Sequence, residues 1–449
     1  MYDKQNLTTG SINNKLIIFA FPLLLANLLQ GLYSVVDMIF VGRFVGETGL
    51  AAISNASMIS FIINSICIGI TMGGMVLTAQ YKGREDKFGQ NETVGTLFSI
   101  TAVFAVIFTV LGLTLYKRLF DMLNVPFESM KDACEYMQII CFATVFVFGY
   151  NAVSSIIKGL GDSKSPLFFV FIAAMINIVL DMVFVGIFKM GTKGAAYATA
   201  LSQFISFVIS VFHLKNKYDI FDFKPKSFAI KADKLIVILK VGIPAAVQMA
   251  VVNVSFLLIT GMLNNFGVAV AAASGVGLKV NTFAGMPCWA VGQAVTAMVS
   301  QNIGKNDIIR VRKTVKAGLK INIAITLVAV IFVQVFAGKI IMLFETSNKE
   351  VIECGILYLR ICCGINSLFY AAMYTFDSFA VGVGAADAAM VNSLLEAVVV
   401  RIIVSWLLAF VFNLGFYGIY AGQAVSPVIP SILGLVFFKS KLWEKNRLI

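Results

Sequence analysis

Residues 15 to 43 read KLIIFAFPLLLANLLQGLYSVVDMIFVGR, a run in which apolar side chains greatly outnumber polar ones. About 20 apolar residues in a helix are enough to cross the roughly 30 Å hydrocarbon core of a bilayer. The apolar residues are continuous and do not alternate with polar ones, which is typical of a membrane helix and not of a barrel strand. This stretch therefore predicts a transmembrane helix.

Comparable runs continue along the rest of the 449 residues. The twelve predicted spans lie at roughly 15–43, 50–80, 93–117, 135–158, 166–188, 194–214, 235–263, 268–300, 315–338, 354–380, 388–412 and 416–438. The chain is 59% hydrophobic and 13% charged, with a mean hydropathy of +0.89, so lipid must be the solvent for much of its surface. We expect an all-α membrane protein with about twelve transmembrane helices.

The distribution of basic residues predicts the orientation of these helices. Met1 to Lys15 is polar and lacks the apolar segment and cleavage site of a signal peptide, so we expect the first helix to remain as an anchor. With a cytoplasmic start, the loops on that side carry about 24 Lys and Arg, against about 9 on the other side. We expect a multi-pass protein of the cell membrane with both termini in the cytoplasm. Topology and anionic lipid account for the net charge of +12, so we expect no nucleic-acid partner.

The chain repeats itself. Pro22 in the first run and Pro244 in the seventh are about 222 residues apart. Three further landmarks recur in the same order at nearly this offset: Ala79–Asp86 as Ser300–Asp307, Gly159–Gly161 as Gly382–Gly384, and Gly191, Gly194 and Ser202 as Gly415, Gly418 and Ser426. Six spans per half make the repeats parallel. We expect two pseudo-symmetric six-helix lobes, 1–214 and 234–449, with a cytoplasmic connector at 215–233 and a cleft between the lobes.

Three carboxylates lie within predicted spans: Asp37, Asp181 and Asp377. A carboxylate at the centre of a membrane helix costs about 2.5 to 3.5 kcal/mol, so an intramembrane acid is a candidate functional residue. Neither Asp37 nor Asp181 has an obvious Lys or Arg on its own helix that would neutralise it. Asp377 lies near a helix end, where reaching water and serving a function are equally good interpretations.

Polar side chains accompany these acids at helical spacing. Asn27, Gln30, Ser34 and Asp37 share one face of the first helix, which should line an interior, and Asn64 belongs to a similar stripe in the second. We take Asn27, Gln30, Ser34, Asn64 and Asp377 as candidates for binding a substrate. On the structural interpretation, such Ser, Thr and Asn side chains only join helices by hydrogen bonds.

Two positions in the fifth run could bind a cation or proton. Asn177 and Asp181 are four residues apart, so an amide and a carboxylate share one helical face and can converge on one ion. Thr199 adds a hydroxyl from the sixth run.

Other features have a structural and a functional interpretation each. Lys279, Glu396 and Arg401 lie within predicted spans, and an ion pair between helices explains them about as well as a binding role. Pro22 removes a backbone hydrogen bond and can kink its helix, which would suit a gate for a helix that carries Asp37.

The remaining reactive residues do not form an enzyme site. The seven cysteines are scattered through apolar runs without metal-ligand spacing, and we interpret them as packing residues. His213 stands alone near the end of the sixth run, where a structural role is expected. Gly304-Lys305-Asn306 lacks the rest of a phosphate-binding loop, so we expect no ATP hydrolysis. Because no intramembrane nucleophile and base or metal ligands are arranged together, we expect no enzymatic activity.

Three motifs resemble those of the multidrug and toxic compound extrusion (MATE) exporters. They are Asp37-Met38-Ile39-Phe40-Val41-Gly42, Asn177-Ile178-Val179-Leu180-Asp181, and Gly194 to Gln203, which reads GAAYATALSQ. The resemblance extends over essentially the whole chain. It implies two six-helix lobes in a V, and a secondary active multidrug efflux transporter that exchanges organic cations or similar drugs for inward H⁺ or Na⁺.

The resemblance also implies site residues. A proton or Na⁺ site in the amino-terminal lobe matches Asp37, Asn177, Asp181 and Thr199, and the proline of the bending first helix matches Pro22. Lys279 and Arg401 resemble basic positions of the branch that relies on this lobe. The seventh run offers Gln248 and Asn253 where another branch has a carboxylate, so we expect coupling through the first lobe. The coupling ion, H⁺ or Na⁺, is the only cofactor implied.

The nearest alternative is a flippase for lipid-linked oligosaccharides or lipids from the same superfamily. Such flippases have arginine-rich clefts that hold pyrophosphate, whereas the spans here hold Lys279 and Arg401 and little more. A channel would usually need a selectivity motif and oligomer symmetry. As partners we expect a small drug-like molecule and membrane lipid, with the protein acting as a monomer.

Overall fold

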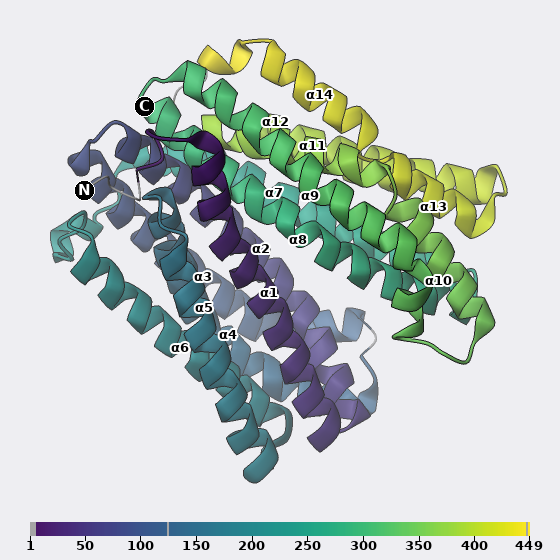
Figure 1. Ribbon diagram of the computed structural model, residues 1–449. Coiled ribbons are helices and arrows are strands. Elements are labelled where there is room, and N and C mark those ends of the chain that lie inside the picture. Colours follow the sequence, from purple (N-terminus) through teal and green to yellow (C-terminus); the bar gives the residue numbers. More distant parts are fainter. Residues whose placement is uncertain (1–5, 124, 446–447) are drawn as a thin grey trace. The chain divides into compact units, whose positions relative to one another are not determined.

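The computed structural model describes residues 6–123, 125–445 and 448–449, and none of these residues belongs to a β-strand. The α-helices are α1 (Ile12–Phe44), α2 (Glu47–Gly83), α3 (Lys87–Met122), α4 (Phe127–Gly159), α5 (Lys164–Asp181), α6 (Gly191–Lys217), α7 (Ala232–Asn264), α8 (Val268–Gly304), α9 (Ile308–Met342), α10 (Lys349–Cys362), α11 (Asn366–Val383), α12 (Ala386–Leu394), α13 (Gly415–Val425) and α14 (Val428–Lys439) (Figure 1). Three π-helical segments extend two of these helices: η1 (Met182–Ile187), η3 (Leu395–Val404) and η4 (Leu407–Val411). Short 3-10 helices occur at η2 (Pro225–Phe228) and η5 (Leu442–Lys445).

The helices are long and apolar enough to confirm the predicted fold class. In the described part of the chain, 11 helices could cross a membrane, or 12 if the bent pair α10 and α11 forms one span. That pair was predicted as one uninterrupted helix at 354–380, but it bends by 49°. Asn366 stabilises the break, because its side chain accepts from the Gly364 backbone N–H and donates to the Cys362 carbonyl, at 3.0 and 2.9 Å.

The two halves repeat one another in backbone detail. Asp86 and Asp307, matched by the repeat, cap α3 and α9 by accepting a backbone N–H three residues on, at 2.9 and 2.8 Å. Positive φ angles recur at matched positions: Gly46, Glu85, Gly161, Lys189 and Gly191 have φ of 90, 60, 92, 52 and 63°, and Gly267, Asn306, Gly384, Asn413 and Gly415 have 98, 63, 92, 55 and 59°. The predicted duplication is therefore confirmed in local geometry.

The chain divides into two compact units within α1 and α7. One unit contains Leu25–Ala246, and the other contains Leu7–Leu24 with Val247–Ile449. Each division falls two residues beyond a matched proline, Pro22 in α1 and Pro244 in α7. This division by contacts does not follow the bounds 1–214, 215–233 and 234–449 expected from the repeat, because each unit takes part of a helix from the other half.

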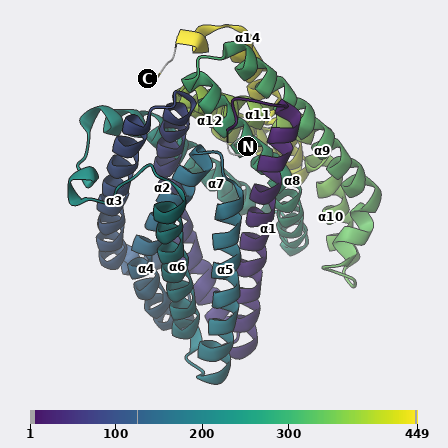
Figure 2. The same ribbon diagram turned by 60° about the vertical axis from the view of Figure 1, so that its left-hand side comes forward.

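Within the first unit, α4 is the central helix. It packs against α2, α3 and α6, and α6 packs in turn against α5 (Figure 2). Small residues such as Ala52 and Ala56 on α2 meet the larger Tyr136 and Met137 of α4 in a buried cluster. This packing holds α2, α4 and α6 around a common interior, where the candidate site lies.

Within the second unit, α8 packs against α9, α10 and α11. Its core contains Ala294, Met298 and Phe379, together with Trp443 from η5 and Leu7 from the segment before α1. Parts of the chain near both termini are therefore packed into this unit.

Candidate functional site

The predicted coupling residues converge inside the first unit. Asp37 lies on α1, Asn177 and Asp181 lie on α5, and Thr199 lies on α6. Asp37 is 7% exposed, and Asn177 and Asp181 are fully buried. Asp37 and Asp181 are close enough to interact with one another directly. Two acids 144 positions apart in the sequence thus form one cluster.

Local backbone geometry brings α5 and α6 together at this cluster. Asp181 is the last α-helical residue before η1, and a π-helical turn widens the helix at that point. Gly194 in the first turns of α6 lies against it, since a Cβ added there would be 3.1 Å from the Phe184 backbone. A side chain at 194 would push the helices apart. The glycine of the GAAYATALSQ motif therefore helps to bring Thr199 to Asn177, whose amide donates to the Thr199 hydroxyl at 3.4 Å.

The cluster is rich in oxygen atoms that accept no hydrogen bond. Among the described residues, Oδ1 of Asp37, Oδ1 of Asn177 and both carboxylate oxygens of Asp181 are buried without a partner. Buried polar atoms are nearly always satisfied in proteins, so four unsatisfied acceptors close together need an explanation. A proton or a small cation supplies what these oxygens lack. Two carboxylates, an amide and a hydroxyl are hard oxygen donors that suit H⁺ or Na⁺.

Two tyrosines complete the cluster, and neither was predicted from the sequence. The Tyr33 hydroxyl donates to the Thr199 hydroxyl oxygen at 3.3 Å, and Tyr33 and Tyr136 both lie within electrostatic reach of Asp37 and Asp181. Tyr33 precedes Asp37 by one helical turn on the same face, a spacing that could have revealed it. Tyr136 comes from α4 and had no such signal.

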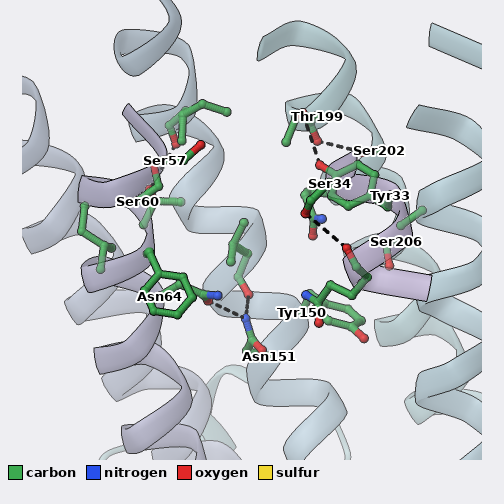
Figure 3. Close-up of a pocket in the computed structure, with 18 of the residues that line it drawn as sticks. Tyr33, Ser34, Ser57, Ser60, Asn64, Tyr150, Asn151, Thr199, Ser202 and Ser206 are labelled. Carbon is green, nitrogen blue, oxygen red and sulfur yellow. Dashed lines mark hydrogen bonds between the residues drawn. The ribbon is translucent and has the colours of Figure 1, made fainter. Parts of the chain in front are cut away.

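A cavity of about 280 Å³ lies beside the cluster, entirely within the first unit. Its polar lining comes from α1, α2, α4 and α6 and includes Gln30, Tyr33, Ser34, Ser57, Ser60, Asn64, Asn151, Thr199, Ser202 and Ser206 (Figure 3). Phe61, Ile140, Val147 and Phe148 add apolar surface. Asn151 donates to Asn64 at 3.5 Å, which joins α4 to α2 across the cavity wall (Figure 3). Thr199 and Tyr33 belong both to this wall and to the carboxyl cluster.

The predicted substrate residues are only partly together. Gln30, Ser34 and Asn64 line the cavity, but Asn27 is not among its lining residues, although it shares their helical stripe. Asp377 belongs to the second unit, so grouping it with the others was wrong for this cavity. The helical pattern fixes which residues share a face and does not fix how far along the helix the cavity extends.

Asp377 is buried, so of its two interpretations the one in which it reaches water does not hold in this structure. It is 4% exposed, and it accepts hydrogen bonds from Asn392 at 2.7 Å and Ser393 at 3.5 Å. Gln248 is one of the two polar residues that the seventh run offers in place of another branch's carboxylate. Its amide donates to the Ser393 hydroxyl at 2.7 Å. The last turn of α12 therefore covers the acid with hydrogen-bond donors.

Of the charged residues Lys279, Glu396 and Arg401, two form an ion pair, but within one helix and not between helices. Glu396 and Arg401 form a buried ion pair within one segment, η3, because a π-helix places residues five apart above one another. Arg401 also donates to Ser255 at 2.8 Å and lies over the Phe256 ring, both on α7. Lys279 is exposed on α8. The pair is thus an intrahelical one that is anchored to a second helix.

Other expected structural residues have ordinary contacts. His213 shares a 2.9 Å hydrogen bond with Ser165 and packs edge-on against Phe169, which fits the structural role expected of it. Five cysteines are buried and two are partly buried, all as free thiols.

Pro22, the candidate gate residue, is buried inside α1, which continues as a helix on both sides of it.

Duplicated membrane helices around a cavity with polar groups in its lining are typical of a multi-span membrane transport protein. The family model MatE matches the chain twice, over residues 22–183 and 244–407, so each half carries one copy and each match begins at a matched proline. The chain belongs to the MatE family. The family predicted from the three motifs is therefore confirmed.

Individual relatives agree with this assignment. The chain is 29% identical over 454 residues to Probable multidrug resistance protein YpnP of Bacillus subtilis, covering 99% of this chain and 98% of the relative. It is 30% identical over 352 residues to Probable multidrug resistance protein YoeA of the same species, covering 77% and 76%. A solved structure described as the outward-facing conformation of a multidrug resistance MATE family transporter of the MOP superfamily has the same fold, with a TM-score of 0.92, 20% identity and 98% coverage of both chains.

Proposed function

We propose that this protein is a secondary active multidrug exporter that moves organic cations or similar drug-like molecules outward in exchange for inward H⁺ or Na⁺. The observation that carries the proposal is the physical link between a cavity and a buried acidic pair. Thr199 and Tyr33 line the cavity, and both contact the cluster that contains Asp37 and Asp181. Relatives named as multidrug resistance proteins support the substrate class.

The cavity lining suits amphiphilic organic molecules. Its wall combines Phe61 and Phe148 with the aromatic rings of Tyr33, Tyr136 and Tyr150. Aromatic faces attract organic cations, and hydroxyl and amide groups around them satisfy polar atoms without demanding one shape. No Lys or Arg is among the described lining residues, which favours a drug over the pyrophosphate head group of a flippase substrate.

The acidic pair supplies a reason for coupling. Two neighbouring carboxylates in a low-dielectric interior repel one another unless a proton or cation neutralises them. Binding of that ion changes the hydrogen bonds that Thr199 can make, and Thr199 belongs to the cavity wall. An ion can shift the protein between drug-binding and drug-releasing states if its affinity differs between the two. In this mechanism the ion and the drug need not touch.

The proposal includes a cellular setting. We place the protein in the cell membrane with both termini in the cytoplasm, because the basic loops segregate to that side. We assign it no catalytic activity, and we propose that one chain is the transporting unit, since the duplicated halves provide a pathway within a single chain.

Transport in proteoliposomes tests the proposal. Purified protein is reconstituted with a fluorescent organic cation, and a pH gradient and a Na⁺ gradient are imposed separately. One of the two gradients should drive movement of the dye, and an ionophore that collapses that gradient should stop it. Protein-free liposomes and an Asp37→Asn, Asp181→Asn double variant are the controls. Dye movement that neither gradient affects would contradict coupled export, and gradient-driven movement of a lipid-linked sugar instead of dye would favour the flippase.

A further inference from the structure

A second hollow lies at the beginnings of α1 and α9, inside the second unit and apart from the drug cavity. Its volume is about 560 Å³, and it is lined by residues 10–13 at the start of α1 and by the first turns of α9 as far as Lys320. Helices α1 and α9 start on the same side of the membrane in a twelve-span topology, so the hollow lies at one end of the spans. We call it the basic groove.

Hydrogen bonds hold the chain before α1 against α8 and α9. The Leu7 backbone N–H donates to the Gln301 side chain at 3.0 Å. The Arg310 guanidinium donates to the carbonyls of Thr9 and Gly10 at 2.8 and 2.9 Å. One wall of the basic groove is therefore a fixed part of the fold. The Arg310 guanidinium is used to hold that wall in place.

The other wall carries uncompensated positive charge. Lys313, Lys316 and Lys320 line the groove at spacings of three and four, so they form one stripe along α9, and all three are exposed. Among the described residues, the ion pair of α9 joins Arg312 to Glu444 and involves none of these lysines. The one acid in the lining is Asp307, and its carboxylate already caps α9 by accepting from the Arg310 N–H at 2.8 Å.

The start of α1 adds to the attraction for an anion. The first turn of α1 has no acidic residue, so the positive end of its dipole is not compensated there. Ser11 and Asn13 contribute polar groups to the lining. A phosphate group in the groove would meet three ammonium groups and a helix N-terminus, which is a favourable arrangement for it.

The surroundings of the groove select a lipid over a free anion. Immediately after the lining residues, α1 exposes Ile17, Ile18 and Phe21, which are 52, 57 and 58% exposed. Beyond Lys320, α9 exposes Val328. A ligand with an anionic head and apolar chains can place its head among the lysines and its chains along these side chains. We propose that the basic groove is a binding site for the phosphate head group of an anionic phospholipid.

Lipid retention by the purified full-length protein tests this proposal independently of transport. Native mass spectrometry in detergent measures binding of phosphatidylglycerol, with phosphatidylcholine as the neutral lipid and inorganic phosphate as the free anion. The groove variant is Lys313→Gln, Lys316→Gln, Lys320→Gln. The charge control is Lys215→Gln, Lys224→Gln, Lys226→Gln, which removes three other exposed lysines. An Arg triple at 313, 316 and 320 keeps the charge.

We expect the wild type and the Arg triple to retain phosphatidylglycerol over phosphatidylcholine. The groove variant should bind phosphatidylglycerol at least about tenfold more weakly, since each lysine near an anionic lipid surface contributes measurably. The charge control should bind as the wild type does. Equal retention by the groove variant, or an equal loss in the charge control, would overturn the proposal. Competition by inorganic phosphate at the same concentration as the lipid would show that the site takes a free anion instead.

Discussion

The hydroxyl of Tyr33 donates a hydrogen bond to the hydroxyl oxygen of Thr199, 3.3 Å away, and so joins α1 to α6 between the cavity and the acidic pair. Thr199 also accepts from the Asn177 amide at 3.4 Å. One hydroxyl group therefore contacts a residue of the cavity wall on one side and a residue of the ion cluster on the other. Thr199 therefore connects the acidic cluster directly to the cavity wall.

Replacing the carboxylates should uncouple transport. Asp37→Asn and Asp181→Asn each keep the shape of the side chain and lose its titration, so each should reduce gradient-driven efflux to background while the protein still inserts. Asp377→Asn should do less, because Asp377 lies in the other unit among its own donors. Efflux, expression and equilibrium drug binding are measured for all three. Undiminished coupled efflux in both Asp37→Asn and Asp181→Asn would remove this site from the mechanism.

Removing the Tyr33 hydroxyl should weaken coupling while the cavity can still bind a drug. Tyr33→Phe loses one neutral hydrogen bond, worth about 0.5 to 1.5 kcal/mol, and coupled efflux should fall by roughly twofold to tenfold. Tyr150→Phe is the matched control, because Tyr150 lines the same cavity and bonds to Ser154 instead of Thr199. Equal effects of the two changes on coupled efflux would assign Tyr33 to drug binding alone.

Pro22→Ala should leave folding largely intact and lower transport. A proline inside a helix removes a backbone hydrogen bond and disfavours the straight helix by about 3 kcal/mol, so alanine should favour an unbent α1. Pro166→Ala is the control, since Pro166 lies in the first turn of α5, where a missing N–H costs little. Efflux is compared at equal expression. Wild-type efflux in Pro22→Ala would count against a hinge at this residue.

The positive-inside pattern predicts where two lysines lie. In a background without native cysteines, a cysteine at Lys224 should be protected from impermeant reagents in intact cells, and one at Lys131 should be labelled. Lys131 lies in the second turn of α4 and Lys224 lies in the segment between α6 and α7, so each reports the direction of a neighbouring helix. The reverse labelling pattern would invert the topology and move the proposed lipid site to the other leaflet.

Acid should destabilise the turn between α4 and α5. Asp162 is buried, which opposes its charge, but hydrogen bonds from Lys217, Tyr218 and Ser165, at 2.7, 2.6 and 2.7 Å, hold its pKa well below the ordinary value. A depressed folded-state pKa stabilises the fold above about pH 4, the unfolded value, and this contribution is lost as the pH falls through the folded value.

Asp162→Asn tests this contribution. The variant should lower the free energy of unfolding by about 1 to 3 kcal/mol near neutral pH and should show a smaller loss of stability in acid than the wild type. Thermal unfolding in detergent between neutral pH and pH 3 measures both. Asp222→Asn is the control, because Asp222 is far more exposed. An unchanged acid profile in Asp162→Asn would assign the acid sensitivity to other groups.

The sequence by itself determined the membrane fold and much of the acidic cluster. A helix that crosses the hydrocarbon must be long and apolar, so each span had to appear as a continuous run, and the repeat from Pro22 to Pro244 followed from the same pattern. The cost of burying a carboxylate made Asp37 and Asp181 conspicuous in those runs. Asn177, at helical spacing from Asp181, followed from periodicity alone.

Only the tertiary structure decided how these residues meet. The orphaned oxygens of Asp37 and Asp181 became neighbours through the packing of separate helices, and the π-helical turn after Asp181 is not encoded in any periodicity. Tyrosine in an apolar run can face lipid, core or cavity, so the roles of Tyr33 and Tyr136 depended on which helix packed opposite them. Asp377 lies in the other unit, which its spacing did not reveal. Spacing predicts which residues share a face of one helix, whereas contacts between helices depend on side chains far away in the sequence.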